Sequence, residues 1–220
     1  MTTNANTNAT TSQNTTAMGK IAQTQHPIHD LLKHRWSSLA FSNRSVEPEK
    51  LCCLLEAARW APSSYNEQPW SFIVATQEDQ TEYNRLLNCL VETNRQWAAQ
   101  APVLILSVAK HHFEGNGQPN RHAFHDVGLA VENLVTQAVA LDLFVHQMAG
   151  FQVEKARELF SIPEGYEPVA AIAVGYLGNP QSLSESLRQR QLAPRTRKPL
   201  AEFVFTGSWG QTSPLVASQD

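Results

Sequence analysis

The stretch ARWAPSSYNEQPWSFIV, residues 58–74, organises the chain around it. Its opening residues close a predicted helix, and the polar residues 63–66 then form a turn with several side-chain donors and acceptors in a row. The apolar, β-prone run 70–74 follows and predicts a buried strand. Together the three pieces make a wall suited to a polar, planar ligand, although an ordinary helix-to-strand connection rich in serine and asparagine has the same pattern.

Composition indicates one soluble domain. The sequence has 220 residues, of which 42% are hydrophobic and 17% are charged, so a sizeable core can form. The formal net charge is −3 and no basic stripe is present, which argues against nucleic acid as a partner. No apolar run reaches the roughly 20 residues of a membrane span. The N-terminus lacks the pattern of a secretory signal, and Cys52, Cys53 and Cys89 lack disulfide or metal spacing, so we predict a cytoplasmic protein with reduced thiols.

The chain divides into three predicted parts. Residues 1–24 are almost all Thr, Asn, Ala, Gln and Ser, and such a segment has too little apolar surface to offset its ordering entropy, so we predict a disordered tail. Residues 25–210 form the predicted folded domain. Residues 211–220 are predicted to be a flexible C-terminal tail.

Periodicity predicts helices and strands within the domain. We expect a helix that ends near residue 60, and further helices over 80–90, 92–100, 126–141, 153–160 and 183–190. We expect strands over 70–74, 103–109, 143–147 and 169–176, with 203–205 as an edge strand. The helix over 126–141 is apolar nearly all round and is therefore predicted to be buried.

The stretch at 58–74 resembles the APSSxNxQPWxF signature of the nitroreductase family, which are FMN-dependent oxidoreductases. Further segments resemble that family in the same order: HRWSSLAFSNRSV (34–46), HDVGLAVENL (125–134), HQMAGF (146–151), AIAVGYLG (171–178) and PRTRKPLAEFVFTGSWG (194–210). The resemblance implies an α+β fold, a three-layer α/β/α sandwich whose central, mostly antiparallel sheet is flanked by helices. It also implies a homodimer with FMN sites at the interface, in which the C-terminal segment of each chain is exchanged with its partner.

The resemblance places the flavin phosphate among arginines. The family's Arg-x-Ser pattern falls on Arg35 and Ser37, with Trp36 contributing its backbone, and holds the phosphate and ribityl chain. Arg195 and Arg197 match the family's phosphate clamp. Guanidinium groups suit a phosphate because their planar fork donates two parallel charged hydrogen bonds. Three cations in four residues are otherwise typical of a solvated surface.

The resemblance also assigns the serine-asparagine turn to a second chain. In the family, the residues that match Ser63, Ser64 and Asn66 reach the flavin of the neighbouring subunit. Each site is then shared between two chains.

A second turn is implied to contact the flavin ring. Met148, Ala149 and Gly150 match the turn whose backbone N–H is directed at flavin N5, and glycine permits such a close approach of backbone to ligand. Asn94 matches an asparagine that bonds the flavin's pyrimidine edge, and a simple surface asparagine remains the alternative.

At Leu39 the sequence departs from the family pattern. The family's second cation, which approaches the N1/O2 edge of the flavin, falls on this position. Its loss bears on redox potential and rate more than on FMN binding.

A metal site is the alternative for the histidine-rich segment. His122 and His125, followed by Asp126, are spaced to present ligands on one side of a helix. No further close-set ligand completes the shell, so we predict no metal and place these residues at a pocket mouth and a helix start.

The predicted activity is that of an FMN-dependent oxidoreductase. It would transfer hydride in a ping-pong cycle from NAD(P)H, through flavin N5, to a nitroaromatic, quinone or similar small-molecule electron acceptor. No nucleophilic triad, phosphate loop or GxGxxG motif is recognisable, which argues against a Rossmann dehydrogenase. The alternatives are a flavin-processing or dehalogenating enzyme on the same scaffold and a non-catalytic flavin-binding protein.

Overall fold

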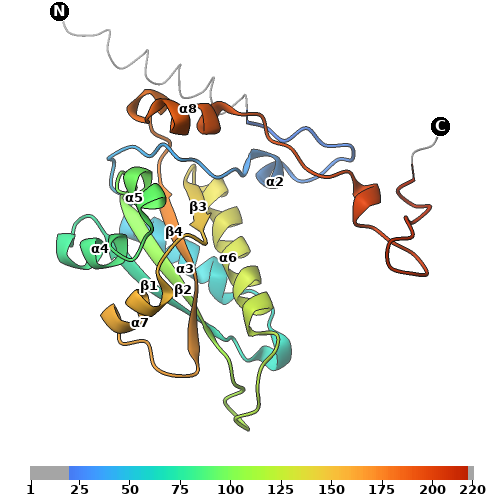
Figure 1. The fold of residues 1–220 in the computed structure, drawn as a ribbon, viewed down its shortest axis with the longest axis horizontal. Helices are drawn as coiled ribbons and strands as arrows, with labels where there is room; N and C mark the ends of the chain where they lie inside the picture. Colours follow the sequence, from blue (N-terminus) through green and yellow to red (C-terminus); the bar gives the residue numbers. More distant parts are fainter. Residues whose placement is uncertain (1–19, 218–220) are drawn as a thin grey trace, which may run out of the picture.

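The computed structural model describes residues 20–217. Its centre is a four-stranded sheet in the order β1-β2-β4-β3, and each neighbouring pair is antiparallel (Figure 1). The strands are β1 (Trp70–Thr76), β2 (Val103–Lys110), β3 (Phe144–Met148) and β4 (Tyr166–Gly175). The four predicted core strands are thus confirmed, with small shifts at their ends.

Helices cover both faces of this sheet (Figure 1). On one face lie α3 (Pro48–Arg59) and α6 (Ala123–Ala140), and on the other lie α4 (Gln80–Leu87), α5 (Glu92–Ala98) and α7 (Val153–Leu159). Side chains of β2 alternate between the two cores: Val103 and Ile105 pack with α3 and α6, whereas Leu104 and Leu106 pack with α4, α5 and α7. The predicted α+β fold with three layers is confirmed.

The predicted buried helix begins earlier than its apolar pattern indicated. α6 starts at Ala123, where the sequence predicted a start at residue 126. Asn120 explains the difference, because its Oδ1 accepts the N–H of His122 at 3.0 Å and its carbonyl accepts the N–H of Ala123 at 3.2 Å. These bonds form a turn that leads directly into the helix.

A C-terminal arm, residues 193–217, follows α8 (Glu185–Leu192). It runs past α2 (Asp30–His34) and then projects away from the sandwich (Figure 1). Three of its large apolar side chains are exposed: Phe203 at 56%, Trp209 at 94% and Leu215 at 87%. A lone chain therefore leaves apolar surface of this arm in water.

The edge strand predicted over 203–205 is wrong for the single chain. Leu200–Glu202 form a short 3-10 helix, and Phe205 makes only an isolated bridge with Thr212. The N–H of Ser213 donates to the carbonyl of Val204 at 2.9 Å. The described part of the predicted C-terminal tail, residues 211–217, thus folds back on the preceding segment of the arm.

The first described residues contact the domain, although composition placed them in the predicted tail. The N–H of Ala22 donates to the carbonyl of Lys33 at 3.0 Å, and the Lys20 side chain is buried. Lys20 and Ala22, which belong to the predicted tail, therefore contact the folded domain. Residues 1–19 of that predicted tail lie outside the described residues.

The described helices are each too short or too polar to cross a membrane. Cys52, Cys53 and Cys89 are free thiols, of which the first two are exposed and the third is buried.

Candidate functional site

Four cationic side chains gather where α2, the arm and the first described residues meet. Arg35 caps the C-terminus of α2, and its Nη1 donates to Ser37 Oγ at 3.4 Å. The charge of Arg197 lies close enough to Arg35 to lower the pKa of Arg35. Arg195 interacts in the same way with Arg35, Arg197 and Lys20. We call Lys20, Arg35, Arg195 and Arg197 the cation cluster. The three arginines that the sequence assigned to the phosphate are therefore brought together by the fold.

Backbone carbonyls hold the cluster in place. Arg195 Nη1 donates to the carbonyls of Lys20 and Lys33, each at 2.8 Å. Lys20 Nζ donates to the carbonyl of Ala193, and it lies 5.5 Å from the centroid of the Trp36 ring. The N-terminal segment, α2 and the arm are thus joined at this point.

The cluster carries more positive charge than its surroundings neutralise. Burial lowers the pKa of Arg35, with Glu132 on α6 opposing the shift and Arg197 adding to it. Burial, followed by the charges of Arg35 and Arg197, lowers the pKa of Arg195. Within residues 20–217, no carboxylate oxygen lies within 4.0 Å of a nitrogen of these four side chains. A bound phosphate would relieve this repulsion and accept hydrogen bonds from the N–H groups of the cluster that have no partner among the described residues.

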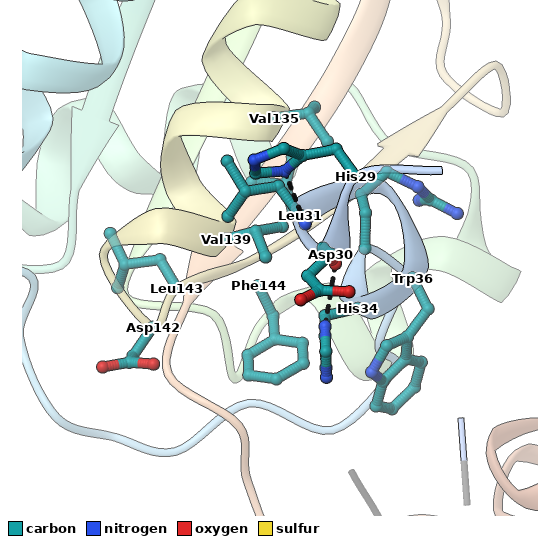
Figure 2. A pocket seen from close by; sticks show the side chains of 12 residues that line it. His29, Asp30, Leu31, His34, Trp36, Val135, Val139, Asp142, Leu143 and Phe144 are labelled. Carbon is teal, nitrogen blue, oxygen red and sulfur yellow. Dashed lines mark hydrogen bonds between the residues drawn. The ribbon is translucent and has the colours of Figure 1, made fainter. Parts of the chain in front are cut away.

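A cavity of about 310 Å³ lies beside the cluster, between α2, the last turns of α6 and the start of β3 (Figure 2). Arg35 and Trp36 form one wall, and the Trp36 ring meets Phe144 edge-on with centroids 5.5 Å apart. The remaining lining residues divide into an apolar group and a polar group: Leu31, Val135, Val139, Leu143, Phe144 and Val145, and then His29, Asp30, His34 and Asp142. The cluster therefore borders a partly apolar hollow.

The turn after β3 is pinned to α5. The carbonyl of Gly150 accepts the N–H of Val91 at 3.1 Å and the side-chain Nδ2 of Asn94 at 3.0 Å. Met148 is buried in the core, whereas Ala149 is exposed. Asn94 was predicted to bond a flavin or to be a simple surface residue, and its amide N–H links α5 to this turn.

The serine-asparagine turn lies between α3 and β1, at the start of α6. Ser64 to Asn66 form a 3-10 turn, and the Ser64 N–H donates to Asp126 Oδ2 at 2.9 Å. The Tyr65 side chain at its tip is 93% exposed. The Ser63 hydroxyl accepts the N–H of Gln68 at 3.0 Å, which closes the turn.

In one chain, the turn and the cavity beside the cation cluster lie near opposite ends of α6. Asp126, which holds the turn, is in the first turn of α6, whereas Arg35 lines the cavity together with Val139 near the end of that helix. At 1.5 Å per residue, Asp126 and Val139 are about 20 Å apart along the helix axis. The turn thus contacts the first turn of α6 and the cavity beside the cluster lies at the end of that helix, while Glu132, between them, is the carboxylate that influences Arg35.

The position of the missing family cation faces the core. The Leu39 side chain is 3% exposed, and its N–H donates to Gln191 Oε1 at 2.7 Å. Gln191 Nε2 in turn donates to Ser38 Oγ at 3.0 Å. Leu39 therefore completes the core, and Gln191 docks α8 on the segment that follows Arg35.

Two residues of this region were missed by sequence reasoning. Lys20 has a signal that could have been used, because it is the only charged side chain among residues 1–24. Gln191 has no such signal in the sequence, because it lies in a polar helix. Its role is visible only in the structure, where the side chain is 2% exposed.

The histidine-rich segment shows no metal-type arrangement. Among the described residues, no three or more His, Cys, Asp or Glu side chains are grouped to hold a metal ion. His125 Nδ1 lies 3.1 Å from Asp126 Oδ1, while Asp126 Oδ2 accepts the N–H of Ser64.

The structure therefore combines a three-layer α+β sandwich with a cluster of cations beside a partly apolar cavity. The sequence model of the protein family described as "Nitroreductase family" matches residues 32–176, which is more than half of the chain. The chain therefore belongs to the nitroreductase family.

Solved structures and curated relatives support the same placement. A crystal structure described as an oxidoreductase containing FMN is 31% identical, covers 86% of this chain and 96% of that one, and has a TM-score of 0.80. A putative NADH dehydrogenase/NAD(P)H nitroreductase of Methanothermobacter thermautotrophicus is 28% identical over 72% of this chain and 80% of its own. The major NAD(P)H-flavin oxidoreductase of Aliivibrio fischeri is 24% identical over 81% of this chain and 98% of its own.

Proposed function

We propose that this chain is an FMN-dependent oxidoreductase that transfers hydride from NAD(P)H to a nitroaromatic, quinone or similar electrophile in a ping-pong cycle. The observation that carries the proposal is the cation cluster, in which Arg35, Arg195 and Arg197 converge without a carboxylate among residues 20–217 within 4.0 Å. The family and the names of the relatives above support the same cofactor and co-substrate.

The residues of the cluster suit the phosphate of FMN. Among the described residues, the guanidinium of Arg35 donates to Ser37 and that of Arg197 to the carbonyl of Thr196, so their further N–H groups can offer forked, charged hydrogen bonds. Arg195 commits Nη1 to two carbonyls, so it contributes its charge and its remaining donors. Ser37, which accepts from Arg35, is exposed beside them. Bound FMN supplies the two-electron chemistry that no side chain of the protein can perform.

The turn at Gly150 suits the flavin ring. Its carbonyl is held by Val91 and Asn94, so the backbone of Ala149 and Gly150 is fixed before a ligand arrives. A fixed N–H donor directed at the ring orients the flavin and requires no proton transfer by a side chain.

The second chain of a homodimer would supply the serine-asparagine turn. In one chain, Ser63, Ser64 and Asn66 lie at the start of α6 and the cavity beside the cluster lies at its end, which supports a site shared between two chains. The projecting arm, with Trp209 and Leu215 exposed, supports an exchange of C-terminal segments. The dimer then completes two sites and covers the apolar arms.

Spectroscopy tests the cofactor and the activity. Purified protein loaded with FMN should show a flavin spectrum, and anaerobic addition of NADH or NADPH should bleach it. Protein that takes up no FMN would refute the proposal. A flavin spectrum that persists with both nucleotides would instead indicate a non-catalytic flavin-binding protein.

A heterodimer tests the shared site. A chain carrying Arg197→Ala is paired with a differently tagged chain carrying Asn66→Ala, and FMN is titrated into the purified heterodimer. If each site is shared between two chains, both substitutions fall in the same site and the other site keeps wild-type affinity for FMN. If each site is built from one chain, each site carries one substitution and neither keeps wild-type affinity.

Dehalogenation on this scaffold is the second candidate. Iodotyrosine deiodinase 1 of Sus scrofa is 26% identical over 127 residues, which cover 47% of this chain and 44% of that protein. Release of halide from a halogenated phenol by the reduced enzyme, with no turnover of nitroaromatics or quinones, would favour this candidate.

A further inference from the structure

The serine-asparagine turn is strained. Tyr65, Asn66 and Gln68 have φ values of 53°, 56° and 52°, a left-handed region that residues with a side chain seldom adopt. Three such residues within four positions persist only when the surrounding structure determines their conformation.

One buried side chain holds the strained part of the turn. Asp126 is 2% exposed, and its Oδ2 accepts the N–H of Ser64 at 2.9 Å, immediately before Tyr65. Its Oδ1 lies 3.1 Å from His125 Nδ1. Because Asp126 belongs to the first turn of the long helix α6, the helix supplies a rigid base for this contact.

The other ties act on the far side of the turn. The N–H of Gln68 donates to Ser63 Oγ at 3.0 Å, within the turn itself. The Glu67 carboxylate accepts the N–H of Glu114 at 2.6 Å and lies 3.9 Å from Lys110 Nζ. These contacts fix the exit toward β1, so the described contact that anchors Ser64 to a helix is the one with Asp126.

We propose that Asp126 is a positioning residue for the flavin site of the neighbouring subunit. It holds Ser64 and the left-handed residues after it, so that the donors of the turn are already arranged when FMN binds across the interface. This inference rests on the proposed function, because it requires that the turn contacts FMN in a second chain. Asp126 itself touches no ligand and acts through the turn.

A matched pair of variants separates positioning from general stability. Asp79 is an exposed carboxylate at the start of α4, on the other face of the sheet, and its Oδ1 accepts the N–H groups of Thr81 and Glu82 of its own helix, each at 3.1 Å. Asp126→Ala and Asp79→Ala should both lower stability to unfolding. In apo-dimers titrated with FMN by fluorescence, Asp126→Ala should weaken binding at least tenfold, and Asp79→Ala by less than twofold.

Hydrogen exchange and the isosteric variant complete the test. Amides of residues 62–68 should exchange faster in apo Asp126→Ala than in the wild type or in Asp79→Ala. Asp126→Asn, which keeps one acceptor for Ser64, should bind FMN with intermediate affinity; it also serves if the alanine variant does not fold.

Three outcomes would overturn the inference in distinguishable ways. If wild-type protein binds FMN and the Asp126 variants bind it equally well, Asp126 has no positioning role and the proposed function stands. If wild-type protein does not bind FMN, the proposed function fails and the inference fails with it. A heterodimer of Asp126→Ala with Arg197→Ala should retain one site of wild-type affinity; loss of affinity at both sites would place the effect of Asp126 within its own chain and contradict the proposal.

Discussion

Replacing Gly150 with alanine should damage both stability and flavin binding. A Cβ at this position would lie 2.5 Å from Asn94 Nδ2 and 2.9 Å from Val91 Cγ2, closer than side-chain carbons approach such atoms. The Asn94 side chain must then swing away and lose its bond to the Gly150 carbonyl. Overpacking costs about 1–3 kcal/mol and the lost hydrogen bond about 0.5–1.5 kcal/mol, so we expect the free energy of unfolding to fall by about 2–4 kcal/mol.

Thermal unfolding of the apo-protein measures this loss, at about 2–4 °C of Tm for each kcal/mol in a domain of this size. The matched control is Gly115→Ala, because a Cβ there meets nothing within 4 Å. That control should stay within about 0.5 kcal/mol of the wild type. FMN titration of the same two variants should show weaker binding for Gly150→Ala alone.

A double-mutant cycle identifies the cause. If Asn94 is the group that the new methyl meets, Gly150→Ala should cost clearly less in an Asn94→Ala background than in the wild type. An equal cost in both backgrounds, or a Gly150→Ala variant as stable as the wild type, would refute the close approach on which the turn's role depends.

Three further outcomes are expected. Arg197→Ala should weaken FMN by the loss of a charged hydrogen bond of about 1.5–3 kcal/mol, and leave the affinity for riboflavin, which lacks the phosphate, unchanged; equal losses for both ligands would remove Arg197 from the clamp. Burial lowers the pKa of His146, so the folded state binds fewer protons than the unfolded state; its contribution to stability is full above a pH of about 6.5 and is lost as the pH falls below that value. His146→Gln should therefore flatten the stability profile between about pH 7 and 5 in chemical denaturation, and an unaltered profile would contradict this. Truncation after Lys198 keeps the arginines and removes the exposed side chains of the arm, so analytical ultracentrifugation should show weaker dimers, whereas an unchanged dimer would exclude the arm from the interface.

Local patterns in the sequence were enough to predict most of the fold. The strand β2 is a continuous apolar run because both faces of the sheet are covered, and the turn after α3 is visible as a cluster of serine and asparagine. The edge strand over 203–205 failed because β-prone composition does not say whether a pairing partner is present in the same chain.

The site was predictable only where a motif encodes it. The convergence of Arg35, Arg195 and Arg197 follows from the family resemblance, because these residues lie in two distant segments that no local rule connects. Gln191 and the burial of Leu39 depend on how α8 docks, and this contact spans 152 positions. Side chains whose role is set by such distant contacts leave no periodic signal in the sequence.

The Arg195 guanidinium bonds the carbonyl of Lys20 across 175 positions of the chain. Contacts between such remote residues form late, because closing a long loop costs conformational entropy before the contact is gained. During synthesis from the N-terminus, the sheet and its helices emerge from the ribosome before the arm does. We therefore expect the cofactor to be loaded after translation of the core, and a nascent chain stalled before Arg195 to be structured yet unable to retain a phosphorylated ligand.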